Sequence, residues 1–354
     1  MTLIDGTSLD EPYADGNFAE GIAYLFIVRD AFSDDIVSWL VMGVFALLAV
    51  AFALPFALHR AKKMSDELHR ELVTRTVSWS WLVAIIGGAI LLGRGATIAA
   101  VALLSLLAYR DFARATGVFR FRSLSVVFTL GTCALAFAAA DRWHRMYFAT
   151  TSLVVLTLAV ITIARDEPRG FVQRVALAIM GFVLFAVSLG YMSLLCDAPH
   201  YRALLLMLIV TVELNDIFAF IVGKSLKGPK LISQTSPKKS ISGCIGALLL
   251  TTTLFALLGH FVFEGTTLGA WSSLIPLGLA VSIAGQMGDL LLSSIKRDVG
   301  IKDFAAAIPG HGGVLDRFDS LVLVPPVLYH TISILNGPLG EGGTVRFFSS
   351  AFLP

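Results

Sequence analysis

Charged residues are scarce in this chain of 354 residues, because Asp, Glu, Lys and Arg make up only 15% of it while 56% is hydrophobic. With a mean hydropathy of +0.80, this composition excludes an ordinary soluble domain. The formal net charge is only +2, and no basic run is interleaved with aromatic residues. We therefore expect no nucleic acid as a partner. The composition indicates a protein that is integral to a membrane and crosses it many times.

Cysteine is also rare. Cys133, Cys196 and Cys244 lie far apart, without the short spacings of a metal site. We interpret them as packing residues, since free cysteine behaves as a small hydrophobic side chain.

Ten apolar runs predict the fold class. In lipid each run must satisfy its own backbone hydrogen bonds, so the sequence predicts an all-α polytopic membrane protein with about ten transmembrane helices. Two of the runs are short and separated only by Gly-Arg-Gly, which predicts either a tight hairpin or a re-entrant pair. The ten runs are 36–58, 77–93, 95–109, 124–140, 147–164, 175–195, 203–222, 243–263, 271–295 and 320–336.

The basic residues predict the orientation. Five alternate connections, 59–76, 109–123, 165–174, 223–240 and 296–319, hold 21 of the 27 Lys and Arg residues. Basic connections stay in the cytoplasm, so both termini are expected outside it. This gives four predicted parts: an extracytoplasmic N-terminal arm 1–35, N-terminal transmembrane helices 36–200, a C-terminal transmembrane catalytic region 201–340 and a C-terminal tail 341–354.

Two stretches near the C-terminus carry polar residues of a different kind. In the first, residues 213–243, Asn215 and Asp216 stand inside an apolar span, where a carboxylate is costly and marks a functional site. Five lysines follow without an acid, and Ser236-Pro237-Lys238-Lys239 predicts a proline-fixed turn that offers a hydroxyl and two ammonium groups to a phosphate. The alternative is that the lysines only hold the loop inside and contact anionic lipid headgroups.

The second stretch, residues 285–320, places Asp289 between glycines in a span and ends in "IPGHGGVLDRFDS". Asp316 and Asp319 stand three apart, so they share a face if the helix of the last span begins there. Carboxylates close to cationic side chains favour magnesium, which takes one or two carboxylates and completes its shell with water and phosphate oxygens. For any one residue the alternative is a salt bridge at a helix end.

The 27 residues from Ser293 to Asp319, "SSIKRDVGIKDFAAAIPGHGGVLDRFD", resemble the signature of the phosphatidate cytidylyltransferase (CDP-diacylglycerol synthase) family. The earlier Ser-Pro-Lys-Lys with a glycine at 243 resembles the second region of that family. The resemblance covers about residues 205–335. It departs from the family at Ser242 and Leu292, where members commonly carry an acidic residue.

The resemblance implies transfer of CMP from CTP to phosphatidate at the cytoplasmic side of a bacterial inner (plasma) membrane. It implies that magnesium is required, with potassium as a second metal, and that Asp289 and Asp316 hold the metals. A homodimer is also plausible from the family.

We assign further roles within that scheme. Asp319 supports the metal cluster; Lys296, Arg297 and Arg317 neutralise the lipid phosphate or the leaving group; and His311 donates to a phosphate or orients its loop. The predicted substrate-binding residues are Asn215, Asp216, Lys224, Ser236, Lys238, Lys239, Lys302 and Asp303.

Three other functions remain open on the sequence alone. One is CTP-dependent transfer to another membrane lipid, and another is a paralogue that binds but does not catalyse. The third is an anion transporter, which also places acids and lysines in a helix bundle; here, however, the polar residues gather in one half of the chain.

Overall fold

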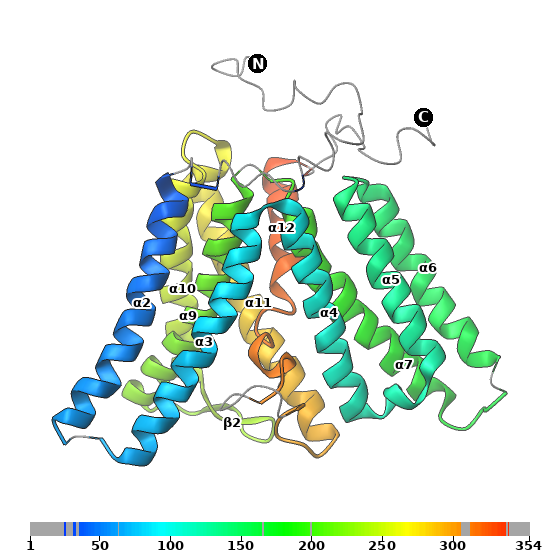
Figure 1. Ribbon diagram of the computed structural model, residues 1–354, viewed down its shortest axis with the longest axis horizontal. Coiled ribbons are helices and arrows are strands. Elements are labelled where there is room, and N and C mark those ends of the chain that lie inside the picture. Colours follow the sequence, from blue (N-terminus) through cyan, green and yellow to red (C-terminus); the bar gives the residue numbers. More distant parts are fainter. Residues whose placement is uncertain are drawn as a thin grey trace.

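The computed structural model describes residues 25, 31–32, 35–62, 64–164, 166–198, 200–305, 312–337 and 339. The predicted N-terminal arm and C-terminal tail lie almost wholly outside these residues, and so does His311. The described part is a helix bundle with one small β-hairpin (Figure 1). Its helices are α2 (Asp35–Arg60), α3 (Asp66–Leu92), α4 (Arg94–Thr116), α5 (Arg122–Ala140), α6 (His144–Ile163), α7 (Phe171–Gly181), α8 (Leu189–Leu195), α9 (Tyr201–Leu226), α10 (Ile241–Val262), α11 (Trp271–Asp298) and α12 (Val324–Asn336).

The all-α membrane architecture is confirmed. In the described part nine helical segments are long and apolar enough to cross a membrane, with α7 and α8 forming one continuous segment. The predicted tenth span differs, because its helix α12 has only 13 residues and begins at Val324 rather than at 320. Residues 312–323 before it form a short 3-10 turn and an irregular segment instead.

The two short runs around Gly-Arg-Gly form a tight hairpin of two full helices. α3 and α4 have 27 and 23 residues, so both are longer than the apolar runs that predicted them. Gly93 separates the two helices with φ 121°, a conformation that residues with a side chain rarely adopt. The lengths exclude a re-entrant pair.

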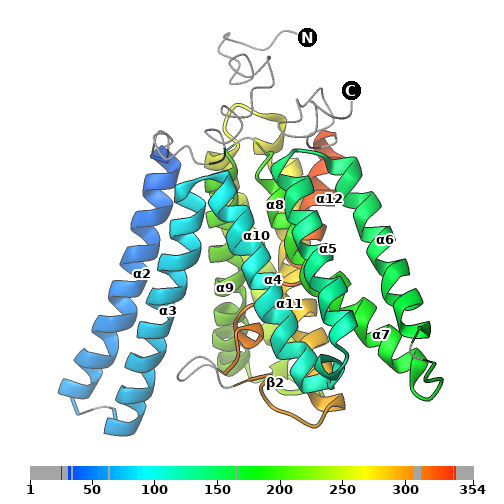
Figure 2. The same ribbon diagram turned by 45° about the vertical axis from the view of Figure 1, so that its right-hand side comes forward.

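The basic connections all lie at one end of the bundle. The α2–α3, α4–α5 and α6–α7 turns, the β-hairpin and the end of α11 are together at the bottom of Figures 1 and 2. The hairpin pairs β1 (Lys230–Ile232) with β2 (Ser236–Ser240) in antiparallel fashion. The start of α2 and the end of α12 lie at the opposite end.

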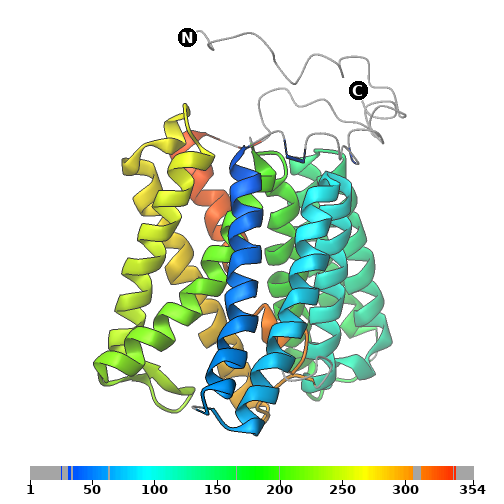
Figure 3. The same cartoon turned by 60° about the vertical axis from the view of Figure 1, so that its left-hand side comes forward.

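Small residues bring α9, α10 and α11 close together. A Cβ on Gly246 would lie 2.4 Å from the side chain of Val222, and one on Gly278 would lie 2.9 Å from the carbonyl oxygen of Thr252. Close backbone approach of this kind is how membrane helices pack without a hydrophobic driving force between them. α2, in contrast, runs along the outside of the bundle (Figure 3), where most of its side chains are exposed.

Between α7 and α8 the helix widens into a π-helix over Phe182–Ser188. Two side-chain hydrogen bonds fix this segment: the Tyr147 hydroxyl donates to the carbonyl of Val187 at 2.8 Å, and the Ser188 hydroxyl donates to the carbonyl of Val322. π-helical turns are rare and occur often at functional sites. Here the π-helix contacts the irregular segment that precedes α12.

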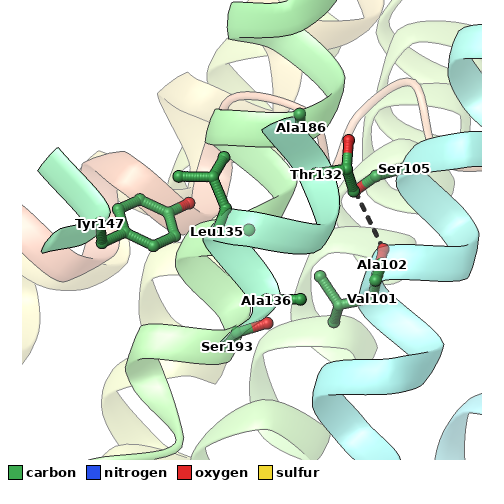
Figure 4. Close-up of a pocket in the computed structure, with 10 residues that line it drawn as sticks. Val101, Ala102, Ser105, Thr132, Leu135, Ala136, Tyr147, Ala186 and Ser193 are labelled. Carbon is green, nitrogen blue, oxygen red and sulfur yellow. Dashed lines mark hydrogen bonds between the residues drawn. The ribbon is translucent and has the colours of Figure 1, made fainter. Parts of the chain in front are cut away.

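A small cavity lies among the helices of the N-terminal half. This cavity of about 10 Å³ lies between α4, α5, α6 and α8, and the side chains of Ser105, Thr132, Tyr147 and Ser193 contribute to its wall (Figure 4). Such a volume is at the lower limit for a single water molecule. This cavity therefore holds neither a nucleotide nor a lipid.

A buried ionic cluster lies at the end of the bundle away from the basic connections. The Asp197 carboxylate is paired with Arg94, with Arg142 at 3.2 Å and with His144 at 3.2 Å, and the Asp197 side chain is fully buried. These residues join the starts of α4 and α6 to the end of α8. Removing one partner from such a cluster destabilises a fold strongly.

We expect the basic end of the bundle to face the cytoplasm. Two exposed glutamates at opposite ends, Glu167 and Glu264, give a matched test, as Glu167→Cys and Glu264→Cys in a chain whose three native cysteines are replaced by alanine. A thiol reagent that cannot cross membranes should label position 264 in intact cells and position 167 only in inside-out vesicles. The reverse labelling would show that the orientation is inverted.

Candidate active site

The irregular segment 312–323 carries the acidic residues predicted to act in catalysis. Leu315–Arg317 forms one 3-10 turn, and α12 begins only at Val324. The expectation that Asp316 and Asp319 share a face of the last helix is therefore wrong. Non-helical backbone in a membrane protein is stable only where protein or water surrounds it, and here Leu315, Asp316, Phe318 and Ser320 are buried.

Glycines in α11 admit this segment. A Cβ on Gly288 would lie 2.7 Å from the carbonyl oxygen of Asp319 and 3.1 Å from that of Ser320. Any larger residue at 288 would push the segment away from the helix. The glycine next to Asp289 thus places the backbone of Asp319 directly against α11.

Asp316 is held by the backbone on one side and by a lysine on the other. Its Oδ2 accepts hydrogen bonds from the N–H groups of Phe304, at 2.8 Å, and Gly313, at 2.9 Å. Its Oδ1 lies 3.2 Å from Nζ of Lys296. Oδ2 is thus engaged by the backbone, and Oδ1 faces the ammonium of Lys296.

Lys296 joins Asp316 to Asp319. The Lys296 ammonium lies 3.5 Å from Oδ2 of Asp319, and it also lies 5.7 Å from the centre of the Phe304 ring. The two carboxylates therefore face one common point, which the ammonium of Lys296 occupies. Lys296 itself is buried, as expected for a lysine that is paired with acids.

Asp289 is paired in a similar way with the β-hairpin. Its Oδ2 lies 2.5 Å from Nζ of Lys239, and its Oδ1 accepts a hydrogen bond from the Ser293 hydroxyl at 3.2 Å. Burial favours the neutral amine of Lys239, but the carboxylates of Asp289 and Asp216 outweigh this effect and raise its pKa. Lys239 is therefore a fixed positive charge on the acid cluster.

The predicted turn at Ser236-Pro237-Lys238-Lys239 is wrong, because these residues form strand β2. Side chains alternate along a strand. Lys239 accordingly points to Asp289, whereas Lys238 is exposed. Only one of the two ammonium groups faces the acids.

Asp216 on α9 completes the cluster. Its Oδ2 accepts a hydrogen bond from the Ser320 hydroxyl at 2.6 Å. Asp319 stands among these acids, in the connection between α11 and α12. Burial, and then the negative charge of Asp289, raise the pKa of Asp319 to about 7. Asp319 thus lies in a buried site close to other carboxylates, and the positive charges of Lys296 and Arg317 oppose the rise in its pKa.

Asn215 lies deeper, in a network between helices. Its Oδ1 accepts hydrogen bonds from Thr251, at 2.9 Å, and from Ser282, at 2.8 Å, and Asn215 is only 1% exposed. It therefore joins α9, α10 and α11 beneath the acids.

The other predicted site residues lie at the rim or outside the described part. The Lys224 ammonium lies 5.6 Å from the centre of the Phe220 ring, and Arg297 donates to the carbonyl of Thr235 at 3.4 Å. Ser236 is half-buried, and Lys302 and Asp303 are exposed. The positive charge of Arg317 acts on Asp319 and opposes the rise in its pKa. His311 is not among the described residues.

The two departures from the family signature have different surroundings. Leu292 is fully buried, so a carboxylate there would point into the protein interior. The Ser242 hydroxyl accepts a hydrogen bond from the N–H of Gly228 at 3.2 Å, and it fixes the chain that leads from α9 into the hairpin.

The chemistry of the acid cluster fits a hard cation. In the described part no three His, Cys, Asp or Glu side chains are arranged to hold a metal ion. Magnesium, however, needs only one or two protein carboxylates beside water and substrate phosphate. Asp289 and the Asp316–Asp319 pair supply such oxygens, and each already faces a positive charge at the distance of an ion pair.

Sequence reasoning missed Asp111. It lies near the end of α4, it is fully buried, and its Oδ2 accepts a hydrogen bond from the N–H of Val314 at 2.9 Å. The charge pattern places residues 109–123 in a basic cytoplasmic connection. The signal in the sequence was an acid directly after the apolar run, in "LLAYRDF".

Comparisons with known proteins identify relatives of this chain. The model of the Cytidylyltransferase family matches residues 73–335. The protein YnbB of Escherichia coli (strain K12), whose function is uncharacterised, is 28% identical over 268 residues, which are 74% of this chain and 87% of that protein. A phosphatidate cytidylyltransferase of Rickettsia bellii is 36% identical over 154 residues, 43% of this chain and 67% of its own, and one of Aquifex aeolicus is 38% identical over 150 residues, 42% and 54% respectively.

The described part is thus a multi-pass helix bundle with an acid cluster at its basic end. The family model covers α4 to α12 and most of α3, so the chain belongs to the Cytidylyltransferase family and is a nucleotidyltransferase.

The two adjacent lysines of β2 give a direct test of this site. We expect Lys239→Gln to lower kcat/KM for cytidylyl transfer by about tenfold or more, because a lost hydrogen bond between charged groups costs roughly 1.5–3 kcal/mol. Lys238→Gln should instead raise KM for the nucleotide by no more than about threefold and leave kcat similar, as expected for an exposed charge. Steady-state kinetics of both variants provide the measurement. Equal losses of kcat would contradict the arrangement of β2.

Proposed function

We propose that this protein transfers the cytidylyl group of CTP to phosphatidate and so forms CDP-diacylglycerol and pyrophosphate. The relatives named phosphatidate cytidylyltransferase support this assignment. The observation that carries it is the cluster of Asp216, Asp289, Asp316 and Asp319 with Lys239 and Lys296. The cluster lies at the basic end of a membrane bundle, where a lipid phosphate and a nucleotide can meet.

The reaction is a displacement at phosphorus. A phosphate oxygen of the lipid forms a bond to the α-phosphorus of CTP, while the bond from that phosphorus to the oxygen bridging to the β-phosphorus breaks. Pyrophosphate leaves with the bonding electrons. The attacking group is already an anion, because a phosphomonoester has a second pKa near ~6, so no strong general base is needed. The protein must instead bring two polyanions together by neutralising charge and fixing geometry.

The residues divide this work. Asp289 and Asp316 would hold magnesium, assisted by Asp319, and potassium would be the second metal. A bound cation there would supply positive charge to the phosphate oxygens. Lys239 would bind the triphosphate, with Lys224, Ser236 and Lys238 at the rim, and Lys302 and Asp303 would contact substrate nearby. Lys296, Arg297 and Arg317 would neutralise the lipid phosphate or the leaving pyrophosphate, and His311 would orient its loop or donate to a phosphate.

In this scheme Lys239 and Lys296 would interact with the carboxylates before the substrates bind and with the phosphates afterwards. In the structure the ammonium groups of Lys239 and Lys296 lie next to the carboxylates. Asp289, Asp316 and Asp319 would hold magnesium, and the ammonium groups of Lys239 and Lys296 would then be available to the incoming phosphates. The same side chains would thus compensate the acids in the resting enzyme and the phosphates in the working one.

The assignment includes a location and partners. The enzyme would lie in a bacterial inner (plasma) membrane with its active site facing the cytoplasm, where CTP is available. The acyl chains of phosphatidate would remain among the helices. It would act as a homodimer, as the family resemblance implies.

The test is transfer of label from CTP to lipid by the purified protein. With magnesium and phosphatidate in mixed micelles, radiolabelled CTP should yield a labelled lipid and pyrophosphate, and a chelator should stop the reaction. Parallel arms should offer a polyprenyl phosphate and a lipid alcohol. Label in one of these, with none in phosphatidate, would replace the acceptor and keep the cytidylyl chemistry. No labelled lipid with any acceptor would refute catalysis of this kind.

Removing a single proposed metal ligand should stop the reaction. We expect Asp289→Asn and Asp316→Asn each to lower kcat by about a thousandfold or more, because each removes a charge that is needed only when the phosphates react. Asp298→Asn, an exposed acid at the end of α11, is the matched control and should retain activity. Near-normal turnover by either cluster variant would exclude its carboxylate from the metal site.

A further inference from the structure

The backbone before Asp316 has a shortage of hydrogen-bond partners. Residues 313–315 enter a 3-10 turn rather than continue a helix, so their N–H groups point away from any preceding turn of the chain. A buried N–H without a partner is costly. Two carboxylates satisfy these groups, and they come from distant parts of the sequence.

Asp316 takes the N–H of Gly313, at 2.9 Å from its Oδ2. Asp111 takes the next two: its Oδ2 lies 2.9 Å from the nitrogen of Val314 and 3.5 Å from that of Leu315. Its other oxygen, Oδ1, faces the guanidinium of Arg110 at 3.1 Å. Both carboxylate oxygens of Asp111 are therefore engaged, and its side chain is fully buried.

Gly313 makes this contact possible. A Cβ on Gly313 would lie 2.8 Å from Oδ2 of Asp111, closer than such atoms approach, so a larger residue would separate α4 from the segment. Hydrogen bonds to an ionised carboxylate are stronger than neutral ones. The contact between α4 and residues 313–315 is thus short, and the Asp111 side chain that makes it is buried.

We propose that Asp111 is a positioning residue of the active site, which fixes the backbone of Val314 and Leu315 so that Asp316 and Asp319 face their common point. Leu315 directly precedes Asp316, so any displacement at 314–315 moves that carboxylate. At its other end the segment is held by Ser188, whose hydroxyl donates to the carbonyl of Val322. The N-terminal half of the chain thereby fixes both ends of the segment that carries the acids. The link to catalysis rests on the proposed function, but the link to backbone geometry does not.

Hydrogen exchange of the metal-free protein tests the geometry directly. In Asp111→Ala, the amides of a peptide that covers residues 312–321 should exchange about ten to a hundred times faster than in the wild type, because a hydrogen bond to a charged group is lost. Asp111→Asn keeps one acceptor oxygen, so a smaller acceleration is expected; it also provides the measurement if the alanine variant does not fold. Binding of Mn²⁺ alone, measured by electron paramagnetic resonance, should weaken about tenfold in both variants, because the carboxylates lose their fixed geometry.

Asp197→Asn is the matched control. Asp197 is also an aspartate of the N-terminal half whose side chain is fully buried and paired with arginine, but it lies at the other end of the bundle. This variant should lower thermal stability while it leaves exchange in residues 312–321 and Mn²⁺ affinity at their wild-type values. If exchange in that peptide is unchanged in the Asp111 variants, or rises equally in Asp197→Asn, the positioning role is refuted.

The exchange result is independent of the reaction. One outcome is faster exchange and weaker Mn²⁺ binding in the Asp111 variants while the wild type labels no lipid. It would support the positioning role and refute the proposed function. Unchanged exchange in the Asp111 variants, together with labelling of phosphatidate by the wild type, would refute the positioning role and support the proposed function.

Discussion

The structure depends on the compensation of buried negative charge. Four aspartates from α9, α11 and the segment before α12 meet at the basic end of a membrane bundle, where an uncompensated carboxylate is costly. Lys239 and Lys296 supply positive charge, and backbone N–H groups supply hydrogen bonds to Asp316. Burial, and then the negative charge of Asp289, raise the pKa of Asp319 in spite of these partners. A site of this kind suits an enzyme that must hold two polyanions close together.

The fold could be predicted from the sequence because lipid leaves the backbone few choices. Long apolar runs in a membrane form helices, and the alternation of basic connections fixed the pairing of loops with ends of the bundle. The prediction that the last helix begins at residue 320 was wrong, because residues 320–323 are not surrounded by lipid. Apolar side chains there are buried by protein, not by lipid, so the backbone is free to be irregular. Hydropathy reports that a residue avoids water and does not report which neighbours cover it.

The site could be predicted in part. Asp289, Asp316 and Asp319 lie within about thirty residues of one another, so the sequence predicted that they lie close together. The lysine-rich loop before them predicted positive charge nearby. Which lysine faces the acids depends on the alternation of strand β2, and a proline suggested a turn instead. Asp111 lies about two hundred residues from its partners. Nothing local marks such a contact, because it arises only when α4 packs against the segment before α12.

Helices of the N-terminal part of the chain also contact the segment that carries the acids. The family model begins at residue 73 and so includes α4 and the π-helical turn, whereas α2 lies outside it. Among the described contacts of the segment before α12, those from Asp111 and Ser188 come from the included helices, and α2 contributes none of the hydrogen bonds or ion pairs of the acid cluster. An irregular segment in a membrane needs hydrogen-bond partners from its neighbours, so the helices that supply them are constrained as closely as the acids. α2 has no such constraint, and its exposed apolar surface is free to meet lipid.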